Sequence, residues 1–228
     1  MSLWGQVNFL DPGSFIQREM ILFHDHALMI ISAIFVLVAL VGLLLLRSTF
    51  SSRRVHEAQT LEIVWTVLPA LLLLTLALPS LRLLYLVDEQ PLSSKNTLKA
   101  IGHQWYWSYE SPFYANLPFD SYMIPESDLL AGDYRLLEVD KRVTFPVGSD
   151  TSVITTSADV IHAWTVPSLG VKMDSVPGRL NMSNVHPLVS GVYYGQCSEI
   201  CGANHAFMPI VLECLPANKM YFISLSKA

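Results

Sequence analysis

Near its start the chain has two long runs of apolar residues, one over residues 27–46 and one over residues 63–87. The first run has no charged side chain, and the second has only Arg82, near its end. About 20 apolar residues in an α-helix cover the roughly 30 Å hydrocarbon core of a bilayer. A secretory signal peptide would have a shorter run after a basic flank. The pattern therefore predicts two transmembrane helices, the second bent at Pro69 and Pro79.

Beyond residue 90 the apolar positions form short runs that are separated by proline, glycine and polar residues. Several runs alternate apolar and polar positions or are rich in Val, Ile, Thr and Tyr; examples are "DTSVITTSADVIHAWTVP", "SGVYYGQC" and "MPIVLECL". Short strands between frequent turns are typical of an all-β sandwich or barrel. We therefore expect two parts: residues 1–90 form an N-terminal segment and a membrane hairpin, and residues 91–228 form an all-β domain.

The composition agrees with a membrane-associated chain. Of the 228 residues, 52% are apolar and only 14% are charged, whereas soluble domains carry about 25% charged residues. The formal net charge of −5 disfavours a nucleic-acid-binding protein, which normally has a basic surface. The link between the two runs carries Arg47, Arg53 and Arg54. Since basic loops stay on the inner side of a membrane, we expect both termini on the outer side.

Residues 193–215, "YYGQCSEICGANHAFMPIVLECL", concentrate side chains that bind metals. Cys197 and Cys201 are followed by His205 and then by Met208. A disulfide between the cysteines would close only a small ring and leave the other two residues unexplained. Zinc accepts two thiolates and an imidazole but rarely a thioether. Thiolate and thioether are soft ligands, and together they favour copper.

A second histidine, His162 in "DVIHAWTVP", lies on an expected strand before this loop. A histidine in such a place more often packs in a core than binds a metal. A blue-copper site needs two histidines, one cysteine and a weak axial methionine, so the second cysteine is one ligand too many. Two thiolates can instead bridge two copper ions, with one histidine on each. The residues alone leave a disulfide, a zinc site and a copper site with one or two ions as alternatives.

The segment "GQCSEICGANHAFMP" closely resembles the copper-A loop of the cytochrome c oxidase subunit II family. Further matches follow in the same order along nearly the whole chain: "FHDHALMI", "WTVLPA", "GHQWYWSYE", "FDSYMIP" and "VIHAWTVPSLGVKMDSVPGRLN". The resemblance implies a cupredoxin-like Greek-key sandwich or barrel behind the transmembrane hairpin. It also implies a binuclear copper centre that is held by the side chains of His162, Cys197, Cys201, His205 and Met208 and by the backbone carbonyl of Glu199.

The resemblance implies roles for further side chains. The carboxylate of Glu199 would bind a magnesium ion shared with subunit I, and Trp105 would receive the electron from cytochrome c. Glu62 would stand at the mouth of a proton path, although a solvated helix start is an equally good explanation of its position. Asp174 would lie near the boundary with subunit I. Cys214 matches no ligand position and is expected to be an ordinary strand residue.

In "IGHQWYWSY" His103, Trp105, Trp107 and Tyr109 alternate with the intervening residues, which predicts one strand through this segment. Core packing or a membrane-interface belt is the expected role of Trp107 and Tyr109. Acidic side chains near Trp105 are candidates for steering basic cytochrome c, with ordinary solvated surface as the alternative. These candidates are Asp120, Asp133, Glu138, Asp140 and Asp159.

The resemblance implies an oxidoreductase subunit that receives electrons from reduced cytochrome c at the copper pair and passes them to haem in subunit I. In subunit I oxygen would be reduced to water and protons would be pumped. The expected partners are subunits I and III, cytochrome c and the lipid bilayer, and no nucleic acid. A short N-terminus without a cleavable leader resembles the mitochondrially encoded form. We therefore expect the mitochondrial inner membrane, with the β-domain and the N-terminus in the intermembrane space, rather than a bacterial plasma membrane.

Two other classes of function stay open. A membrane-tethered copper carrier would use the same ligands without a redox partner, but it would not need the "WTVLPA" hairpin or the aromatic segment. A quinol-oxidase subunit would share the architecture and lack the metal, and the intact set of five side-chain ligands disfavours it.

Overall fold

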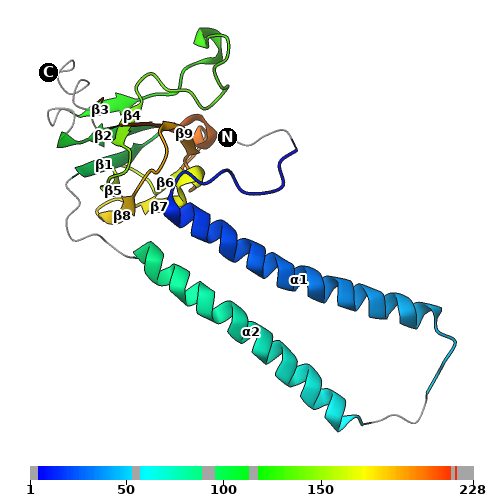
Figure 1. Cartoon of the computed structure of the whole chain (residues 1–228). Helices are drawn as coiled ribbons and strands as arrows, with labels where there is room; N and C mark the ends of the chain where they lie inside the picture. The colour runs from blue at the N-terminus through cyan, green and yellow to red at the C-terminus, as the bar shows by residue number, and fades with distance from the viewer. Residues whose placement is uncertain (1–4, 53–56, 89–95, 113–117, 217–218, 220–228) are drawn as a thin grey trace. The chain divides into compact units, whose positions relative to one another are not determined.

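A computed structural model describes residues 5–52, 57–88, 96–112, 118–216 and 219 of the chain (Figure 1). The chain forms two compact units. One unit comprises residues 19–87, and the other comprises the residues before 19 together with those from 88 onward. The first unit is helical, and the second contains the strands.

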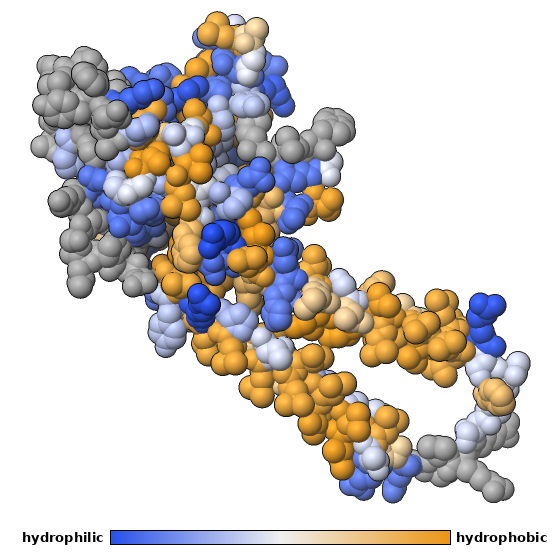
Figure 2. Space-filling view, viewed as in Figure 1, coloured by the Kyte–Doolittle hydropathy of each residue, from blue (hydrophilic) through white to orange (hydrophobic). Residues whose placement is uncertain are grey.

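The helical unit contains both predicted membrane runs. Helix α1 spans Phe15–Arg47 and helix α2 spans Gln59–Asp88, and both are long and apolar enough to cross a membrane. Apolar side chains cover the two helices along their length (Figure 2). Pro69 and Pro79 lie inside α2. An apolar surface of this kind is stable in hydrocarbon and unfavourable in water, so the structure confirms the prediction of two membrane-spanning helices.

The other unit is all-β, as the pattern predicted. One sheet contains five strands in the order β3 (Phe119–Ser121), β2 (Tyr106–Glu110), β1 (Asn96–His103), β5 (Thr151–Ser157) and β8 (Asn181–Val185). A second sheet contains β4 (Val143–Pro146), β10 (Pro209–Leu215) and β9 (Gly191–Gln196). Strands β6 (His162–Val166) and β7 (Val171–Ser175) form an antiparallel pair. β1 runs parallel to β5 and β10 runs parallel to β4, whereas the other pairs are antiparallel.

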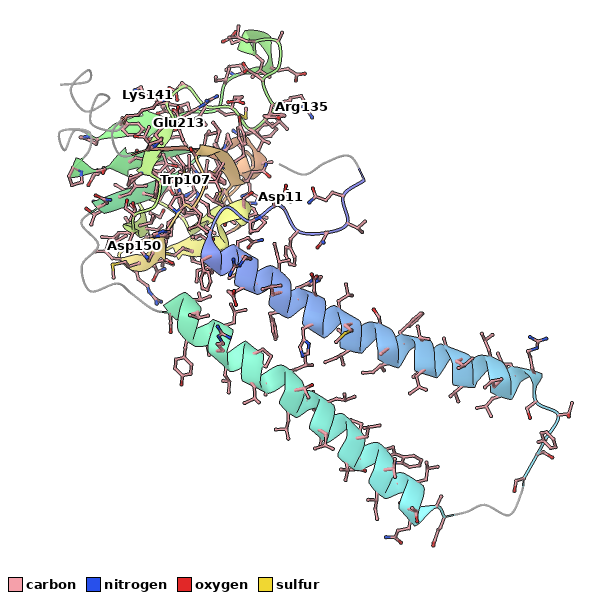
Figure 3. The ribbon with its side chains drawn as sticks, viewed as in Figure 1. Asp11, Trp107, Arg135, Lys141, Asp150 and Glu213 are labelled. Carbon is pink, nitrogen blue, oxygen red and sulfur yellow. The ribbon has the colours of Figure 1, made fainter. Side chains whose placement is uncertain are left out.

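One hydrophobic core joins these sheets. Trp107 from the first sheet and Phe145 from the second are fully buried in the same cluster, and Figure 3 shows Trp107 inside the β-domain. The Trp107 indole N–H donates a hydrogen bond to the Met208 carbonyl at 3.3 Å. Cys197 and Cys201 belong to this core as well. Three of the predicted metal ligands, Cys197, Cys201 and Met208, are therefore anchored in the close-packed core of the domain.

The prediction of one strand through "IGHQWYWSY" is wrong. The chain reverses at Gln104 and Trp105, so that β1 and β2 form an antiparallel hairpin in which His103 pairs with Tyr106. Trp107 consequently lies opposite Gly102 and faces the core, on the other side of the sheet from His103. The turn contains neither glycine nor asparagine, which normally mark a two-residue turn in a sequence. The alternation therefore continues across it without a sign of reversal.

Glu138, a predicted docking residue, is only 3% exposed and is thus not available for docking. Its carboxylate forms an ion pair with Arg142 at 3.0 Å and accepts a hydrogen bond from the Tyr194 hydroxyl at 2.8 Å. Burial, and then the hydrogen bond with Glu138, raises the pKa of Tyr194 to about 12. A buried carboxylate needs such partners because an unpaired buried charge is costly. Glu138 therefore fastens its own segment to strand β9.

The residues just before helix α1 are bonded to the β-domain. The Gly13 N–H donates to the Ser168 carbonyl at 2.7 Å, and the Ser14 hydroxyl donates to the Leu169 carbonyl at 2.7 Å. The same Ser14 oxygen accepts the Gln17 N–H at 3.1 Å, which is the usual hydrogen bond of a serine at a helix N-terminus. The start of α1 is thus tied to the loop between β6 and β7.

Candidate metal centre

The candidate ligands come from two places in the β-domain. Five of them, four side chains and the Glu199 carbonyl, lie in the loop between β9, which ends at Gln196, and β10, which begins at Pro209. The remaining side chain, His162, is the first residue of β6 and is 0% exposed. A Cβ atom on Gly195 of β9 would overlap the Thr165 carbonyl oxygen of β6. The absence of a side chain at Gly195 lets the two strands approach closely, and this approach brings His162 to the loop.

The structure brings the six predicted ligands together. The two thiol sulfur atoms are 4.0 Å apart, and the Cys197 sulfur lies 3.9 Å from His162 Nδ1. The Cys197 sulfur also lies 3.3 Å from the Glu199 carbonyl oxygen. The Cys201 sulfur lies 3.5 Å from His205 Nδ1 and 3.5 Å from the Met208 sulfur. Each thiol therefore has one imidazole and one further donor beside it.

These distances exclude a disulfide in this structure. A disulfide has a sulfur–sulfur distance of about 2.05 Å, and all three cysteines are free. A metal–thiolate bond is about 2.3 Å long, so one ion can contact both sulfur atoms across 4.0 Å. Six donors exceed the four that zinc normally takes, and the set combines soft sulfur with imidazole. The donor set therefore fits copper.

The two thiols differ in their acidity. Burial raises the pKa of both, but the hydrogen bond with His162 brings the pKa of Cys197 below its ordinary value. Burial and the neighbouring Cys197 raise the pKa of Cys201. Two thiolates at this distance repel each other in a buried site, so the second ionises only when a cation lies nearby. The site is therefore suited to bind a positive ion.

His162 is held from several sides. A Cβ atom on Gly102 would lie 2.7 Å from its Cδ2 atom, and the ring centroid of Trp107 is 5.9 Å away, edge-on. Its Nε2 atom lies 2.8 Å from the Asp159 carboxylate, which leaves Nδ1 directed at Cys197. Burial alone would lower the pKa of His162, but the hydrogen bonds with Cys197 and Asp159 raise it. This contact of Asp159, a candidate docking residue by sequence, is not apparent from the local pattern of residues.

The Gln104–Trp105 turn contacts the same loop. The Gln104 side-chain N–H donates to the Cys201 carbonyl at 2.7 Å. A Cβ atom on Gly202 would lie 3.0 Å from Trp105 Cζ2, so the indole ring packs directly on the residue after Cys201. Gly202 has a φ of +131°, which other residues rarely adopt. Gln104 was not identified from the sequence, because an exposed glutamine in a turn carries no sign of its partner.

The other candidate residues lie outside this cluster of donors. The Asp174 side chain is exposed on β7, and Glu62 is exposed in the first turn of α2, in the helical unit. Cys214 is fully buried in β10, which confirms the prediction of an ordinary strand residue.

Comparisons with known proteins agree with this site. Family models described as the periplasmic and the transmembrane domain of cytochrome c oxidase subunit II match residues 96–215 and 2–83. The chain is 65% identical over 215 residues to cytochrome c oxidase subunit 2 of Albinaria caerulea, covering 94% of this chain and 96% of the relative. It is 52% identical over 223 residues to the subunit 2 of Drosophila melanogaster, covering 98% and 96%.

A solved structure has the same fold. The crystal structure of the periplasmic domain of subunit II of cytochrome oxidase from Bradyrhizobium japonicum is 41% identical in sequence, with a TM-score of 0.54. It covers 59% of this chain, and 94% of that structure is matched. The match supports the cupredoxin-like fold that the sequence resemblance implied. From the family models and the relatives together, this chain belongs to the cytochrome c oxidase subunit II family.

Proposed function

We propose that this chain is the subunit of a respiratory cytochrome c oxidase that receives electrons from reduced cytochrome c at a binuclear copper centre and passes them to haem in subunit I. The observation that carries this proposal is the convergence of two thiols, two imidazoles, a thioether and a carbonyl within one loop and the strand beside it. Oxygen reduction and proton pumping would occur in subunit I. Family membership supports this assignment.

In this proposal the side chains of His162, Cys197, Cys201, His205 and Met208 and the carbonyl of Glu199 hold the two copper ions. A copper pair there would supply one-electron redox chemistry. The contribution of the protein is a rigid, dry cage: both cysteines and Met208 are buried within the hydrophobic core. Close packing limits the movement of the donors between redox states, and burial and neighbouring hydrogen bonds tune the reduction potential.

Glu199 is proposed to serve two metals. Its carbonyl lies beside Cys197, and its half-exposed carboxylate would bind a magnesium ion shared with subunit I. Carboxylate oxygen is a preferred ligand of magnesium, which is usually held by one or two carboxylates and other groups. The rest of that site would come from the partner subunit. Subunit III is a further proposed partner.

Trp105 is proposed to receive the electron. Its ring packs against Gly202, next to Cys201. An electron that arrives at the indole would therefore have only a short distance to travel to the ligand loop. Cytochrome c is basic, and the acidic side chains that remain available on the domain surface would steer it to this place. These are Asp120, Asp133, Asp140 and Asp159.

We place the chain in the mitochondrial inner membrane, with residues 1–90 as the N-terminal segment and hairpin and residues 91–228 as the copper domain. The two apolar helices support the membrane location. The arginine-bearing link and the acidic flanks favour the β-domain and the N-terminus in the intermembrane space. On that orientation Glu62 would face the inner side, where a carboxylate at the start of a span can accept protons.

The full-length chain, purified in detergent and loaded with copper, is expected to bind two copper ions. Electron paramagnetic resonance should show hyperfine splitting from two equivalent copper nuclei that share one unpaired electron. Loading with zinc alone, which has no redox chemistry, provides the control without a signal. The hyperfine pattern of a single copper nucleus would contradict the binuclear centre. Absence of copper binding would instead favour a quinol-oxidase subunit.

Replacing Trp105 with leucine is expected to slow reduction by cytochrome c about tenfold or more, since a buried aromatic at a protein contact contributes roughly 1.4 kcal/mol or above. The copper spectrum should stay unchanged, because Trp105 donates no ligand. Tyr134→Leu is the matched control: this aromatic residue is exposed on the same domain, and its ring packs against Tyr194 rather than the ligand loop. Equal rates of reduction in the two variants would refute the role of Trp105.

A further inference from the structure

We propose that Asp159 and Gln104 are positioning residues that tie the Trp105 turn to the copper ligands, so that the electron-receiving ring and the metal cage are held as one rigid unit. This inference rests on the proposed copper centre and adds to it two residues that bind no metal themselves. It explains how a turn without glycine or proline is kept in a single place.

Asp159 uses both of its carboxylate oxygens. Oδ1 accepts hydrogen bonds from His162 Nε2 at 2.8 Å and from the Val160 N–H at 2.6 Å. Oδ2 accepts the backbone N–H of Gln104 at 2.6 Å. A carboxylate that accepts from the far nitrogen of a metal-binding histidine fixes the tautomer and the ring orientation and raises the basicity of the ligand. The same carboxylate therefore orients a copper ligand and anchors the residue next to Trp105.

Gln104 makes the second connection. Its backbone N–H binds Asp159, and its side-chain N–H binds the Cys201 carbonyl. The turn is thus fastened to the histidine side of the centre through Asp159 and to the cysteine side through Gln104. Trp105 directly follows Gln104 in the turn and packs against Gly202, where no side chain separates the indole from the backbone.

These hydrogen bonds predict two effects of mutation that would not follow if Asp159 and Gln104 only contacted cytochrome c at the surface. Loss of the Asp159 acceptor should disturb the metal site itself, because the His162 ring is then free to turn. Loss of the Gln104 side chain should disturb only the electron transfer through Trp105, because the ligands keep their other contacts. The Asp159 side chain is 31% exposed and is also proposed to steer cytochrome c, so the test must separate its positioning role from its surface charge.

The test compares three variants of the full-length, copper-loaded chain: Asp159→Ala, Asp159→Asn and the control Asp128→Ala. Asp128 is an exposed acidic residue of the short helix Glu126–Asp128, and its carboxylate accepts a hydrogen bond from Ser127. Asp159→Ala is expected to lower copper affinity by about 10- to 100-fold in competition with a copper chelator and to change the copper hyperfine splitting. Asp159→Asn retains one acceptor oxygen, so it should show a smaller loss. Asp128→Ala should match the unmodified chain.

Equal copper affinity and spectra in Asp159→Ala and Asp128→Ala would overturn the role of Asp159. If Asp159→Ala does not fold, as judged by its thermal unfolding midpoint, the comparison of Asp159→Asn with Asp128→Asn decides in the same way. A failure of the unmodified chain to show the two-copper signal would contradict the proposed function instead, so the two failures are distinguishable.

For Gln104→Ala, the test compares the rates at which two reductants, cytochrome c and dithionite, reduce the copper centre. Reduction by cytochrome c is expected to slow about tenfold, whereas reduction by dithionite, which does not require the Trp105 contact, should keep its rate. The copper spectrum should be unchanged. Unchanged reduction by cytochrome c, or equal slowing with both reductants, would overturn the role of Gln104.

Discussion

Replacing Cys201 with alanine is expected to remove the two-copper signal completely, and with it electron transfer from cytochrome c. Its sulfur is the donor that lies next to Cys197, His205 and Met208 at once. Without it, His205 and Met208 have no thiol beside them, and only the half of the site formed by His162, Cys197 and the Glu199 carbonyl keeps its thiol, so at most one copper should bind. Copper content per chain and electron paramagnetic resonance measure the result.

Cys214→Ala is the matched control for this experiment. The chemical change is the same, but Cys214 is 0% exposed in strand β10 and is not within the ligand cluster. We expect the two-copper signal to persist, with a loss of roughly 1 kcal/mol in the free energy of unfolding from the small cavity. Two equivalent copper nuclei in the Cys201→Ala spectrum would disprove bridging by this thiol.

Replacing Gly195 with alanine is expected to lower the free energy of unfolding by more than about 3 kcal/mol, beyond the usual cost of overpacking. The added Cβ would overlap the Thr165 carbonyl oxygen, and its distance to Val166 Cγ2 would be 3.2 Å. A backbone carbonyl cannot rotate away as a flexible side chain can, so β6 and β9 must separate. These strands carry His162 and lead into Cys197, so copper binding should be lost together with stability.

Gly191→Ala provides the control in the same strand, four residues earlier on the same face. A Cβ atom at Gly191 would meet nothing within 4 Å, and we expect a change within about 0.5 kcal/mol. Thermal unfolding of both variants, followed by circular dichroism, measures the difference. Similar unfolding midpoints would show that the approach of β6 to β9 tolerates a side chain.

Some features were predictable because they depend on neighbouring residues in the chain. The two membrane helices follow from the length of the apolar runs, since spanning a bilayer requires only enough consecutive apolar residues. The ligand loop is similarly compact. Cys197, Cys201, His205 and Met208 all lie within the twelve positions 197–208, and their spacing already limits the kinds of metal that the loop can bind. Frequent turns and alternating positions also indicated the all-β domain.

Other features were missed because they depend on residues that are distant in sequence. The turn at Gln104 and Trp105 contains no turn-forming residue, and it is held by Asp159 and by the Cys201 carbonyl. Glu138 looks like a surface acid in the sequence, but Tyr194, 56 residues later, helps to bury and satisfy it. Neither partner can be inferred from local pattern, because hydrogen bonds of this kind form only after the sheets have packed.

The kinds of donor, the order of the elements and the membrane anchor were therefore already set by the amino-acid order, since side-chain chemistry and local periodicity decide them. The convergence of His162 with the cysteine loop, and of the Trp105 turn with both, required the folded domain. These contacts join segments 35 and 97 residues apart, and they are selected by close packing at Gly102, Gly195 and Gly202. Such close contacts between backbone segments exist only in the assembled core, because the position of each segment depends on the segments packed around it.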